Sequence, residues 1–448
     1  MLVAWSWLAT PLLSAVPVAH VLHVPLIDAW FESISGYTTT GLSVFTGGVD
    51  PDYGVYIPSV EELPWSVLWW RAVSQWLGGF GVVVLFYTIG RLGGLPAHLI
   101  GAAEGRYERL EPSIAHSIKA LMSLYVVLTI LGTALLYIAG MGPADALYHT
   151  MTGLATGGFS THSSSIGFFD SVVVEAATIV VMLVGAFNFA DMYAVLRGVP
   201  RRFSGEIPGL LAIVAVEVTL GAVLLYATGW APAGPVREAV YDVVSAATGT
   251  GFGISDLSGA PDAYKMLLVL AMLVGGSALS TTGGIKVFRA IIITRSIAWA
   301  VAETVYGEKK VTIKRVGSYV VDQSLLQSVA SVLVLFLASL LAGALALMLV
   351  TGASAADAFF EAQSALCTVG LSVGITGAEA SAATKAILMV LMTLGRLEVI
   401  GFLYAAVAAR KMLRETLLAR RRGRRPRLER LRLPKPAPPV EGEVLYRA

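Results

Sequence analysis

Four short stretches rich in threonine, glycine and serine offer oxygen atoms that could coordinate a cation. Aligned on one glycine each, they read Thr38-Thr39-Thr40-Gly41-Leu42-Ser43, Thr156-Gly157-Gly158-Phe159-Ser160, Gly249-Thr250-Gly251-Phe252-Gly253 and Thr368-Val369-Gly370-Leu371-Ser372. A backbone that points successive carbonyl groups one way must visit dihedral angles that side chains forbid, so glycine is expected there. Threonine hydroxyls can add further oxygens. The alternative, four unrelated polar turns, does not account for the sequence that precedes each stretch.

The same register extends backwards from each glycine. An acid followed by alanine lies thirteen residues earlier, and an aromatic residue lies ten residues earlier. The pairs are Asp28-Ala29, Asp145-Ala146, Glu238-Ala239 and Asp357-Ala358, and the aromatic residues are Phe31, Tyr148, Tyr241 and Phe360. About 11 residues from acid to loop would form a helix of roughly 16 Å, half a bilayer. The acid would then lie at the helix N-terminus, and the negative C-terminal end would face the loop.

Composition places the chain in a membrane. Of its 448 residues, 56% are hydrophobic and only 14% are charged, whereas a soluble domain carries about 25% charged residues. The first apolar segment lacks a basic start and a small-residue cleavage site, so it is expected to be a membrane helix and not a signal peptide. The single cysteine, Cys367, excludes an intrachain disulfide.

Apolar runs of about 20 residues predict eight membrane helices, at about 3–22, 66–90, 117–140, 171–196, 208–228, 262–297, 323–350 and 384–409. One glycine loop falls between the two helices of each consecutive pair. The expected fold is therefore an all-α membrane protein of four tandem helix–pore-loop–helix repeats. Their predicted ranges are 1–90, 117–196, 208–300 and 323–410, followed by a basic, proline-rich cytoplasmic tail at 411–448.

Lysine and arginine positions predict the orientation. Of the 32 basic residues, 28 lie in segments on the side away from the four loops. The positive-inside rule then puts the loops outside and both termini in the cytoplasm. The first external segment carries acids that would either concentrate cations at the mouth or be ordinary solvated loop acids; they are Asp28, Glu32, Asp50, Asp52, Glu61 and Glu62.

At these residues the chain resembles the Trk/Ktr/HKT superfamily of potassium transporters, most closely its Trk and Ktr membrane subunits. The resemblance rests on the four loops and on three further stretches, Trp70–Gly79, Ser280–Lys286 and Gly395–Glu398. Trk subunits usually carry further helices before the first repeat, which leaves a shortened Trk form and a Ktr-like architecture as alternatives. The resemblance implies one pseudo-fourfold pore per chain, homodimers, a cytoplasmic ring of nucleotide-binding regulatory subunits, and an inner-membrane location.

The resemblance also assigns a potassium filter, with potassium as the substrate and no cofactor in this chain. Its residues would be Thr39, Thr40, Gly41, Thr156, Gly157, Gly158, Gly249, Thr250, Gly251, Thr368, Val369 and Gly370. Glycine at all four aligned positions is the pattern associated with potassium in this family, and serine at the first is associated with sodium.

The sixth apolar run contains a candidate gate. Four glycines in ten residues cost a helix roughly 3–4 kcal/mol relative to alanine, so a break is expected there. The proposed gate residues are Gly275, Gly276, Thr281, Thr282, Gly283, Gly284 and Lys286, together with Arg396 in the eighth helix. A glycine-rich packing face is the alternative for the glycines. For Arg396, expected near mid-membrane, the alternatives are an electrostatic barrier to cations or a structural pair with Glu398 or another acid.

Other functions are less consistent with these patterns. A sodium-permeable or sodium-coupled relative would use the same fold. A secondary transporter of a small solute predicts ionisable residues at a midplane site, and the loops contain none. A receptor or scaffold would leave the four aligned glycines unexplained, and no constellation typical of an enzyme occurs. The arginine-rich tail predicts contact with anionic membrane lipid and no nucleic-acid partner.

Overall fold

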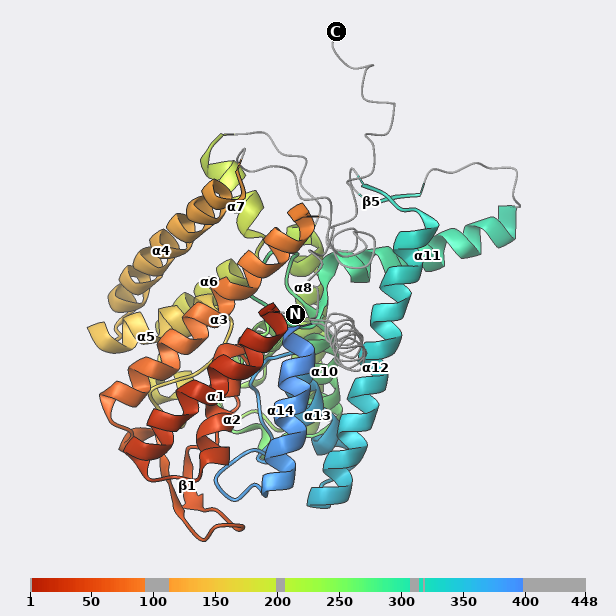
Figure 1. Cartoon of the computed structure of the whole chain (residues 1–448). Coiled ribbons are helices and arrows are strands. Elements are labelled where there is room, and N and C mark those ends of the chain that lie inside the picture. Colours follow the sequence, from red (N-terminus) through yellow and green to blue (C-terminus); the bar gives the residue numbers. More distant parts are fainter. Residues whose placement is uncertain (1, 93–112, 199–205, 307–313, 317–318, 398–448) are drawn as a thin grey trace, which may run out of the picture.

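Helices form almost all of the regular structure (Figure 1) in the computed structural model, which describes residues 2–92, 113–198, 206–306, 314–316 and 319–397. Four consecutive parts of the chain share one order: a long helix, a short helix, a loop and a second helix. The first helices are α1 (Leu2–Leu22), α4 (Ile114–Ala139), α8 (Glu206–Thr228) and α12 (Gln323–Thr351). The short helices are α2 (Leu26–Tyr37), α5 (Pro143–Leu154), α9 (Pro235–Ala247) and α13 (Ala355–Leu366). The second helices begin with α3 (Trp65–Leu92), α6 (Val172–Ala186), α10 (Asp262–Leu273) and α14 (Ala382–Arg396).

The short helices have 12 or 13 residues and begin where the sequence predicts. Proline stands in the first turn of α5 and α9 and directly before α2, where its missing N–H costs no hydrogen bond. Ser354 caps α13 by accepting a hydrogen bond from the Asp357 N–H at 3.1 Å. The acid of each repeat lies in the first turn of its short helix, so it interacts favourably with the helix dipole.

Helix packing is cyclic. Each first helix packs on the short helix that follows it, as α1 does on α2. Each second helix packs on its own short helix and on that of the next part: α3 on α2 and α5, α6 on α5 and α9, and α10 on α9 and α13. The last one, α14, packs on α13 and returns to α2, so that the first and last parts of the chain lie side by side (Figure 1).

Two of the second helices are broken. The chain turns by 97° between α6 and α7 (Phe189–Leu196), so the expectation of one continuous helix over 171–196 was wrong. The turn occurs at Phe187 and Asn188, and the Asn188 side chain caps α7. The break expected in the sixth run is confirmed: α10 ends at Leu273 and α11 (Val287–Tyr306) begins after a loop.

Short strands and 3-10 turns, which the sequence analysis did not anticipate, complete the described structure. An antiparallel hairpin of β1 (Thr46–Val49) and β2 (Tyr56–Ser59) follows the first loop. β3 (Val274–Gly275) pairs in parallel with β4 (Ile285–Lys286) and so holds together the two sides of the break between α10 and α11. The remaining elements are β5 (Arg315–Val316), β6 (Tyr319–Val320), η1 (Val60–Glu62), η2 (Ser165–Phe169) and η3 (Leu257–Gly259).

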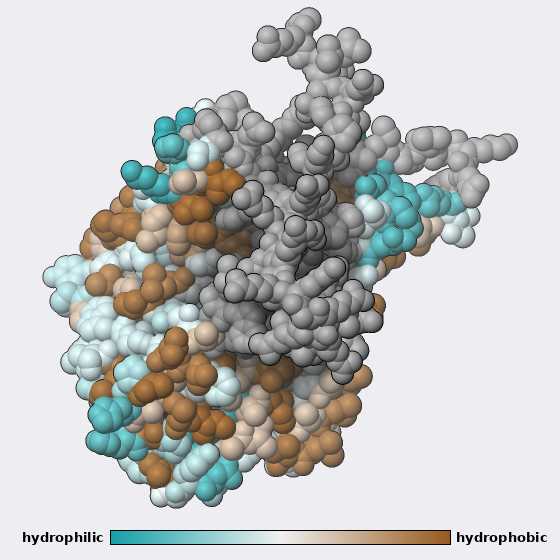
Figure 2. Space-filling model, in the orientation of Figure 1, coloured by the Kyte–Doolittle hydropathy of each residue, from teal (hydrophilic) through white to brown (hydrophobic). Residues whose placement is uncertain are grey.

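Large apolar side chains are exposed along the first helices. α4, α8 and α12 are each long and apolar enough to cross a membrane, and the bent pair α6 and α7 qualifies if it is counted as one span. Exposed residues on them include Val127, Ile130, Leu131, Val216, Leu220, Val223, Val334, Leu337, Leu341 and Leu345. Figure 2 shows hydrophobic residues over much of one face, with hydrophilic residues gathered at its upper left, over α11 and along the lower edge. Apolar exposure on this scale indicates a lipid-facing surface.

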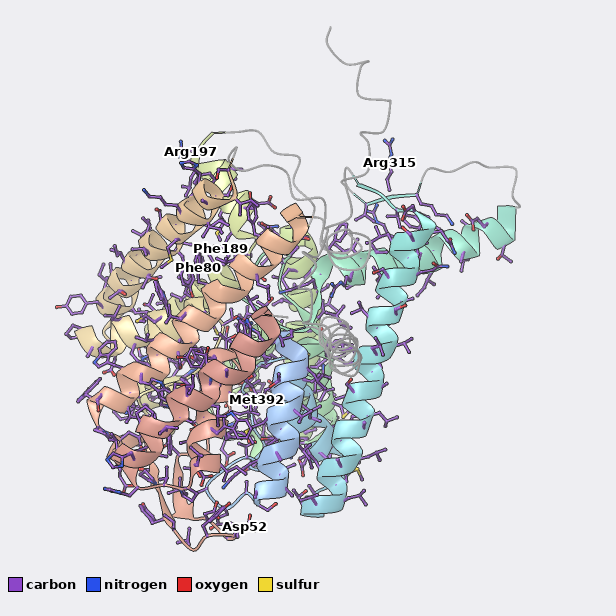
Figure 3. The ribbon with its side chains drawn as sticks, viewed as in Figure 1. Asp52, Phe80, Phe189, Arg197, Arg315 and Met392 are labelled. Atoms are coloured by element: carbon purple, nitrogen blue, oxygen red, sulfur yellow. The ribbon has the colours of Figure 1, made fainter. Side chains whose placement is uncertain are left out.

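The charged residues labelled in Figure 3 lie at opposite ends of the molecule, the acid at one end and the two arginines at the other. Asp52 lies at the lower end in Figure 3, whereas Arg197 and Arg315 lie at the upper end. This separation is what the sequence distribution of lysine and arginine predicts for a protein with two differently charged faces.

Four basic residues lie on the loop side, and each one bridges two neighbouring parts of the chain. Arg71 of α3 pairs with Glu32 at 2.7 Å and donates to the Ser160 carbonyl at 3.0 Å. Arg237 of α9 binds Glu175 of α6 at 2.5 Å. Lys265 of α10 binds Asp357 of α13 at 2.7 Å. The cations that depart from the positive-inside pattern therefore connect successive parts of the ring.

Lys385 closes the ring, because it joins α14 to residues at the start of the chain. Its ammonium group contacts Asp28 of α2 and Asp50 beside the hairpin, and all three side chains are fully buried. Backbone contacts strengthen this junction: the Ala382 N–H donates to Asp52 at 2.6 Å. Two buried carboxylates thus depend on one ammonium group.

We predict that Lys385→Met lowers the stability of the purified protein by about 3–5 kcal/mol, because removing one partner of a buried ion pair leaves charge uncompensated. Thermal unfolding in detergent would measure this as a lower transition temperature. Adding Asp28→Asn should recover part of the loss, since one of the two stranded carboxylates is then neutral.

The matched control is Lys314→Met. Lys314 pairs with Glu303 at 2.9 Å on the surface, where such a pair contributes about 1 kcal/mol or less. If the two lysine variants lower the transition temperature equally, the junction at Lys385 has no special role in stability.

Candidate ion-coordinating site

Each short helix ends in the same backbone motif. The residue two positions before the aligned glycine has a left-handed backbone, with φ of 54° at Thr39, 51° at Thr156, 64° at Gly249 and 52° at Thr368. The N–H of the next residue reaches back to a carbonyl five residues earlier, as from Thr40 to Ser35 at 2.9 Å. The same bond occurs in the other three loops, at 2.8 to 3.0 Å. This is the Schellman ending, which satisfies free carbonyls at a helix C-terminus. The four loops therefore share one conformation despite different residues.

The four aligned glycines lie in a closed ring. All have positive φ, from 72° at Gly158 to 99° at Gly370. A Cβ atom added to any one of them would lie 2.0 to 2.2 Å from a carbonyl oxygen of the next loop. The pairs are Gly41 with Gly157, Gly158 with Thr250, Gly251 with Val369, and Gly370 with Thr40. Any side chain would collide with backbone, so both conformation and space require glycine at these four positions.

A cavity of about 370 Å³ opens directly on this ring. Its lining includes all four aligned glycines and the residues two positions after them, Ser43, Ser160, Gly253 and Ser372. The charged residues in its lining are Arg71 and Asp256. The other polar groups in the lining are mainly hydroxyl and backbone groups, and they lie beside apolar side chains such as Phe45 and Leu371. With a single carboxylate, this cavity suits a monovalent cation better than a carboxylate-bound divalent ion. Within the described residues there is no cluster of three or more His, Cys, Asp and Glu side chains that could hold a metal.

A second register of polar residues, overlooked in the sequence, fixes three of the four loops from behind. Nine residues before the glycine, Glu32 accepts a hydrogen bond from Ser43 at 3.0 Å, and Glu361 accepts one from Ser372 at 2.8 Å. His149 occupies the equivalent position and lies 2.9 Å from the Ser160 hydroxyl, so it is a bracing residue, not a ligand. An acid or histidine nine residues before the aligned glycine, together with a serine two residues after it, is a pattern that the sequence alone shows.

The third loop lacks this brace. Gly253 replaces the serine, and the equivalent acid, Asp242, instead accepts a hydrogen bond from Tyr264 at 3.0 Å. The other carboxylate oxygen of Asp242 is buried without a hydrogen-bond partner. The third loop is held by other contacts instead: the Gly253 N–H donates to the Ser165 hydroxyl at 3.3 Å, and the Ser255 hydroxyl donates to Glu238 at 2.7 Å.

Arg71 and Gln75 of α3 connect the first two loops. Arg71 binds Glu32 behind the first loop, stacks on the Phe159 ring at 3.9 Å and reaches the Ser160 carbonyl. Gln75 donates to the Gly157 carbonyl at 2.6 Å and accepts from the Phe159 N–H at 3.2 Å. Both residues belong to the Trp70–Gly79 stretch, and their contacts are those of bracing residues.

Threonine hydroxyls in the loops differ in their partners, and that of Thr156 donates to the Ala155 carbonyl at 2.8 Å. Those of Thr40 and Thr250 are bonded to Thr38 and Thr248, each at 2.8 Å. Those of Thr39 and Thr368 are buried and make no hydrogen bond to the described protein. Two unpartnered hydroxyls at equivalent positions of the first and fourth loops are therefore available as ligands.

The loop between α10 and α11 lies against the ends of the short helices. Thr281 Oγ1 lies 3.0 Å from the Leu154 carbonyl oxygen of α5 and 3.2 Å from Thr156 Oγ1. A Cβ on Gly283 would lie 2.3 Å from Thr368 Oγ1. The loop thus contacts the second and fourth glycine loops from the side opposite the open cavity.

Two basic residues hold this loop in place. Lys286 folds back to the Thr282 carbonyl at 2.5 Å. Arg396 of α14 donates to the Thr281 carbonyl at 2.7 Å and to the Gly78 carbonyl at 3.0 Å, and its guanidinium is buried. Glu398, the acid considered as its partner, lies outside the described residues. Within the described residues, both hydrogen bonds of Arg396 go to backbone oxygens.

Three of the six acids of the first external segment, Asp28, Glu32 and Asp50, cannot form an acidic mouth because they are buried, whereas Asp52, Glu61 and Glu62 are exposed. Asp28, Glu32 and Asp50 are fully buried in ion pairs. Glu61 accepts hydrogen bonds from the Ser163 hydroxyl and N–H at 2.6 and 2.7 Å. Partial burial raises the pKa of Glu61, but these two hydrogen bonds outweigh it and hold the pKa below its usual value. These acids position the loops and do not line the cavity.

Comparison with known proteins places this geometry among cation transporters. The family model for TrkH, described as a cation transport protein, matches residues 1–207 and 210–415. The Trk system potassium uptake protein TrkH of Halomonas elongata is 35% identical over 395 residues, which are 83% of this chain and 77% of that protein. The uncharacterised cation transporter MJ1485 of Methanocaldococcus jannaschii is 30% identical over 89% of this chain and 80% of its own length.

A solved structure has the same fold. The crystal structure of the potassium transporter TrkH from Vibrio parahaemolyticus superimposes with a TM-score of 0.77 and 29% sequence identity. The match covers 90% of this chain and 83% of that protein.

We predict that replacing any of the four ring glycines with alanine destabilises the protein more than a positive φ alone explains. The matched control is Gly54→Ala, since Gly54 has φ of 65° but no atom within 4 Å of an added Cβ. The control variant should lose about 1 kcal/mol of folding stability, because alanine is strained at a positive φ. Each ring variant should lose about 1–3 kcal/mol more folding stability than this control, because neighbouring backbone must move to make room for the added Cβ. The ring variants are Gly41→Ala, Gly158→Ala, Gly251→Ala and Gly370→Ala. Thermal unfolding measures the difference, and ring variants indistinguishable from Gly54→Ala would disprove the close approach.

Proposed function

The chain belongs to the TrkH family of cation transport proteins, and we propose that it takes up potassium across the cytoplasmic membrane through a pore enclosed by its four glycine loops. The observation that carries the proposal is the closed ring of contacts between each aligned glycine and the carbonyl of the next loop. A ring of backbone oxygens can replace the hydration shell of an ion.

The proposed architecture is four pore repeats, with ranges 1–90, 117–196, 208–300 and 323–410, around a pseudo-fourfold axis. Cyclic packing of the second helices on successive short helices supports it. In this arrangement eight helices cross the membrane. The first helices face lipid, and each second helix packs on two of the short helices.

The proposed potassium ligands come from the twelve filter residues of the four loops. Carbonyl groups supply most of the oxygens, and the unpartnered hydroxyls of Thr39 and Thr368 supply two more. Four short helices direct their C-terminal ends at the ring, and each end carries roughly half a negative charge. This field stabilises a cation without placing an acid in the filter, which would hold the ion too tightly for conduction.

The proposed gate is the loop from Gly275 to Lys286. Its contacts with Thr156 and Thr368 support a position at the inner end of the proposed filter. Glycine at 283 permits the close approach, and the bond from Arg396 to the Thr281 carbonyl holds the loop there. Arg396 also adds a positive charge below the filter, which raises the barrier to cations.

Orientation and partners remain part of the proposal. The loop side faces outward and both termini face the cytoplasm, in line with the position of Arg197 and Arg315 opposite Asp52 (Figure 3). A homodimer, a cytoplasmic ring of nucleotide-binding regulatory subunits and contact of the tail with lipid are proposed from the family resemblance and the sequence. The tail, 411–448, lies outside the described residues.

Ion flux into liposomes that contain the purified protein tests the function directly. We predict that potassium and rubidium enter faster than sodium, because all four filter positions carry glycine. Gly41→Ser should reduce this preference, since its side chain would push on the Gly157 carbonyl. Equal sodium and potassium flux in the parent protein would favour a sodium-permeable relative and contradict the potassium assignment.

A second prediction separates the two roles of Arg396. Arg396→Ala removes charge and hydrogen bonds together, so potassium flux should rise. Arg396→Lys keeps the charge but cannot bond both the Thr281 and Gly78 carbonyls in the same geometry. Flux near the parent's in the lysine variant indicates a charge barrier, and flux near the alanine variant's indicates a mechanical clamp. Unchanged or lower flux in a folded alanine variant would contradict the proposed gate.

A further inference from the structure

A second cavity, of about 460 Å³, lies between α4 and α7, at the end of the molecule that carries Arg197 (Figure 3). None of the residues that line it belongs to the glycine loops or lines the cavity on the ring. Its lining is His116, Lys119, Ala120, Ser123, Leu124, Val127, Tyr193, Leu196 and Arg197. This set combines basic groups with apolar ones and contains no acid.

The α4 side of the cavity is a single stripe that changes in character along the helix. His116, Lys119 and Ser123 are spaced by three and four residues and so lie on one face, close to the helix start at Ile114. Leu124, next to Ser123, and Val127 continue this face toward the middle of the helix. The cavity is therefore polar and basic at the end of the helix and apolar toward its middle.

The α7 side exists because the chain turns by 97° after α6. Phe189, at the start of α7, is anchored by an edge-on contact with the Tyr125 ring of α4, with centroids 5.7 Å apart. At the other end of α7, the Arg197 guanidinium lies 5.2 Å from the centroid of the Tyr193 ring. This contact keeps a second permanent positive charge beside that of Lys119.

We propose that this cavity binds one anionic phospholipid of the cytoplasmic leaflet, with its phosphate between Lys119, Arg197 and His116 and its acyl chain along Leu124 and Val127. Basic pockets between membrane helices on the cytoplasmic side suit such headgroups, because the positive charges complement the phosphate and the apolar wall continues into the bilayer. A free phosphate would gain nothing from the apolar part of the lining.

The lipid site is physically connected to the loop proposed as the gate. The Phe189 N–H at the start of α7 donates to the Leu279 carbonyl at 3.3 Å, and the Ser277 N–H donates to the Ala186 carbonyl at 2.9 Å. A lipid that holds α7 against α4 therefore also holds in place the turn between α6 and α7, to which the gating loop is hydrogen-bonded. This second half of the inference rests on the proposed function, and predicts that anionic lipid changes potassium flux.

Native mass spectrometry of the purified full chain, titrated with phosphatidylglycerol, tests the site. The double variant Lys119→Gln, Arg197→Gln should bind the tightest phosphatidylglycerol about 25-fold more weakly than the parent, since each basic group near an anionic lipid contributes a factor of about five. Arg315→Gln is the matched control: it removes an exposed arginine at the same end of the molecule, away from the cavity, and should bind like the parent.

Two further probes identify the source of the phosphate. Phosphatidylcholine should not occupy the site, and millimolar inorganic phosphate should not displace phosphatidylglycerol. Equal binding by parent and double variant, or displacement by inorganic phosphate, would overturn the lipid site.

Potassium flux in phosphatidylcholine liposomes, with and without phosphatidylglycerol, tests the connection to the gate. The parent and Arg315→Gln should respond to phosphatidylglycerol, and the double variant should not. A double variant that loses the lipid but keeps the response would overturn the connection. Absence of flux in the parent would instead contradict the proposed function, and the binding result would stand independently of it.

Discussion

The close approach of four glycines to four neighbouring carbonyls is the constraint on which the structure depends. Each loop fits only if the next one is in register, because a displacement of one carbonyl would reach the glycine of its neighbour. The surrounding features serve this register. Schellman endings set the backbone of each loop, Glu32, His149 and Glu361 brace three of them from behind, and Arg71, Arg237, Lys265 and Lys385 join successive quarters.

The four loops are nevertheless not equivalent, and the third differs most from the others. The third quarter lacks the serine brace and has glycine in place of threonine at its left-handed position. The same quarter contains the broken helix whose loop contacts Thr156 and Thr368. In the proposed function, movement of the gating loop and ion coordination would be mechanically linked through these contacts with Thr156 and Thr368.

Much of this arrangement could be predicted from the sequence, because repeats reveal what single residues do not. The acid, the aromatic residue and the glycine at fixed spacing predicted the short helices, and the density of glycine predicted the break after Leu273. The 97° turn at Asn188 was missed although Gly185 and the helix-capping Asn188 lie at it, because the residues around it are apolar enough for a continuous helix. The roles of the external acids were misjudged for a related reason: burial of Asp28 and Asp50 depends on Lys385, more than 300 residues away.

The central claim is that a potassium-like cation binds inside the glycine ring. Anomalous scattering from crystals of the full chain grown in rubidium tests it most directly. The account predicts rubidium peaks between the four loops, beside Gly41, Gly158, Gly251 and Gly370, and weaker occupancy when sodium competes. A well-ordered ring with no rubidium in it, or rubidium bound only elsewhere, would contradict the account.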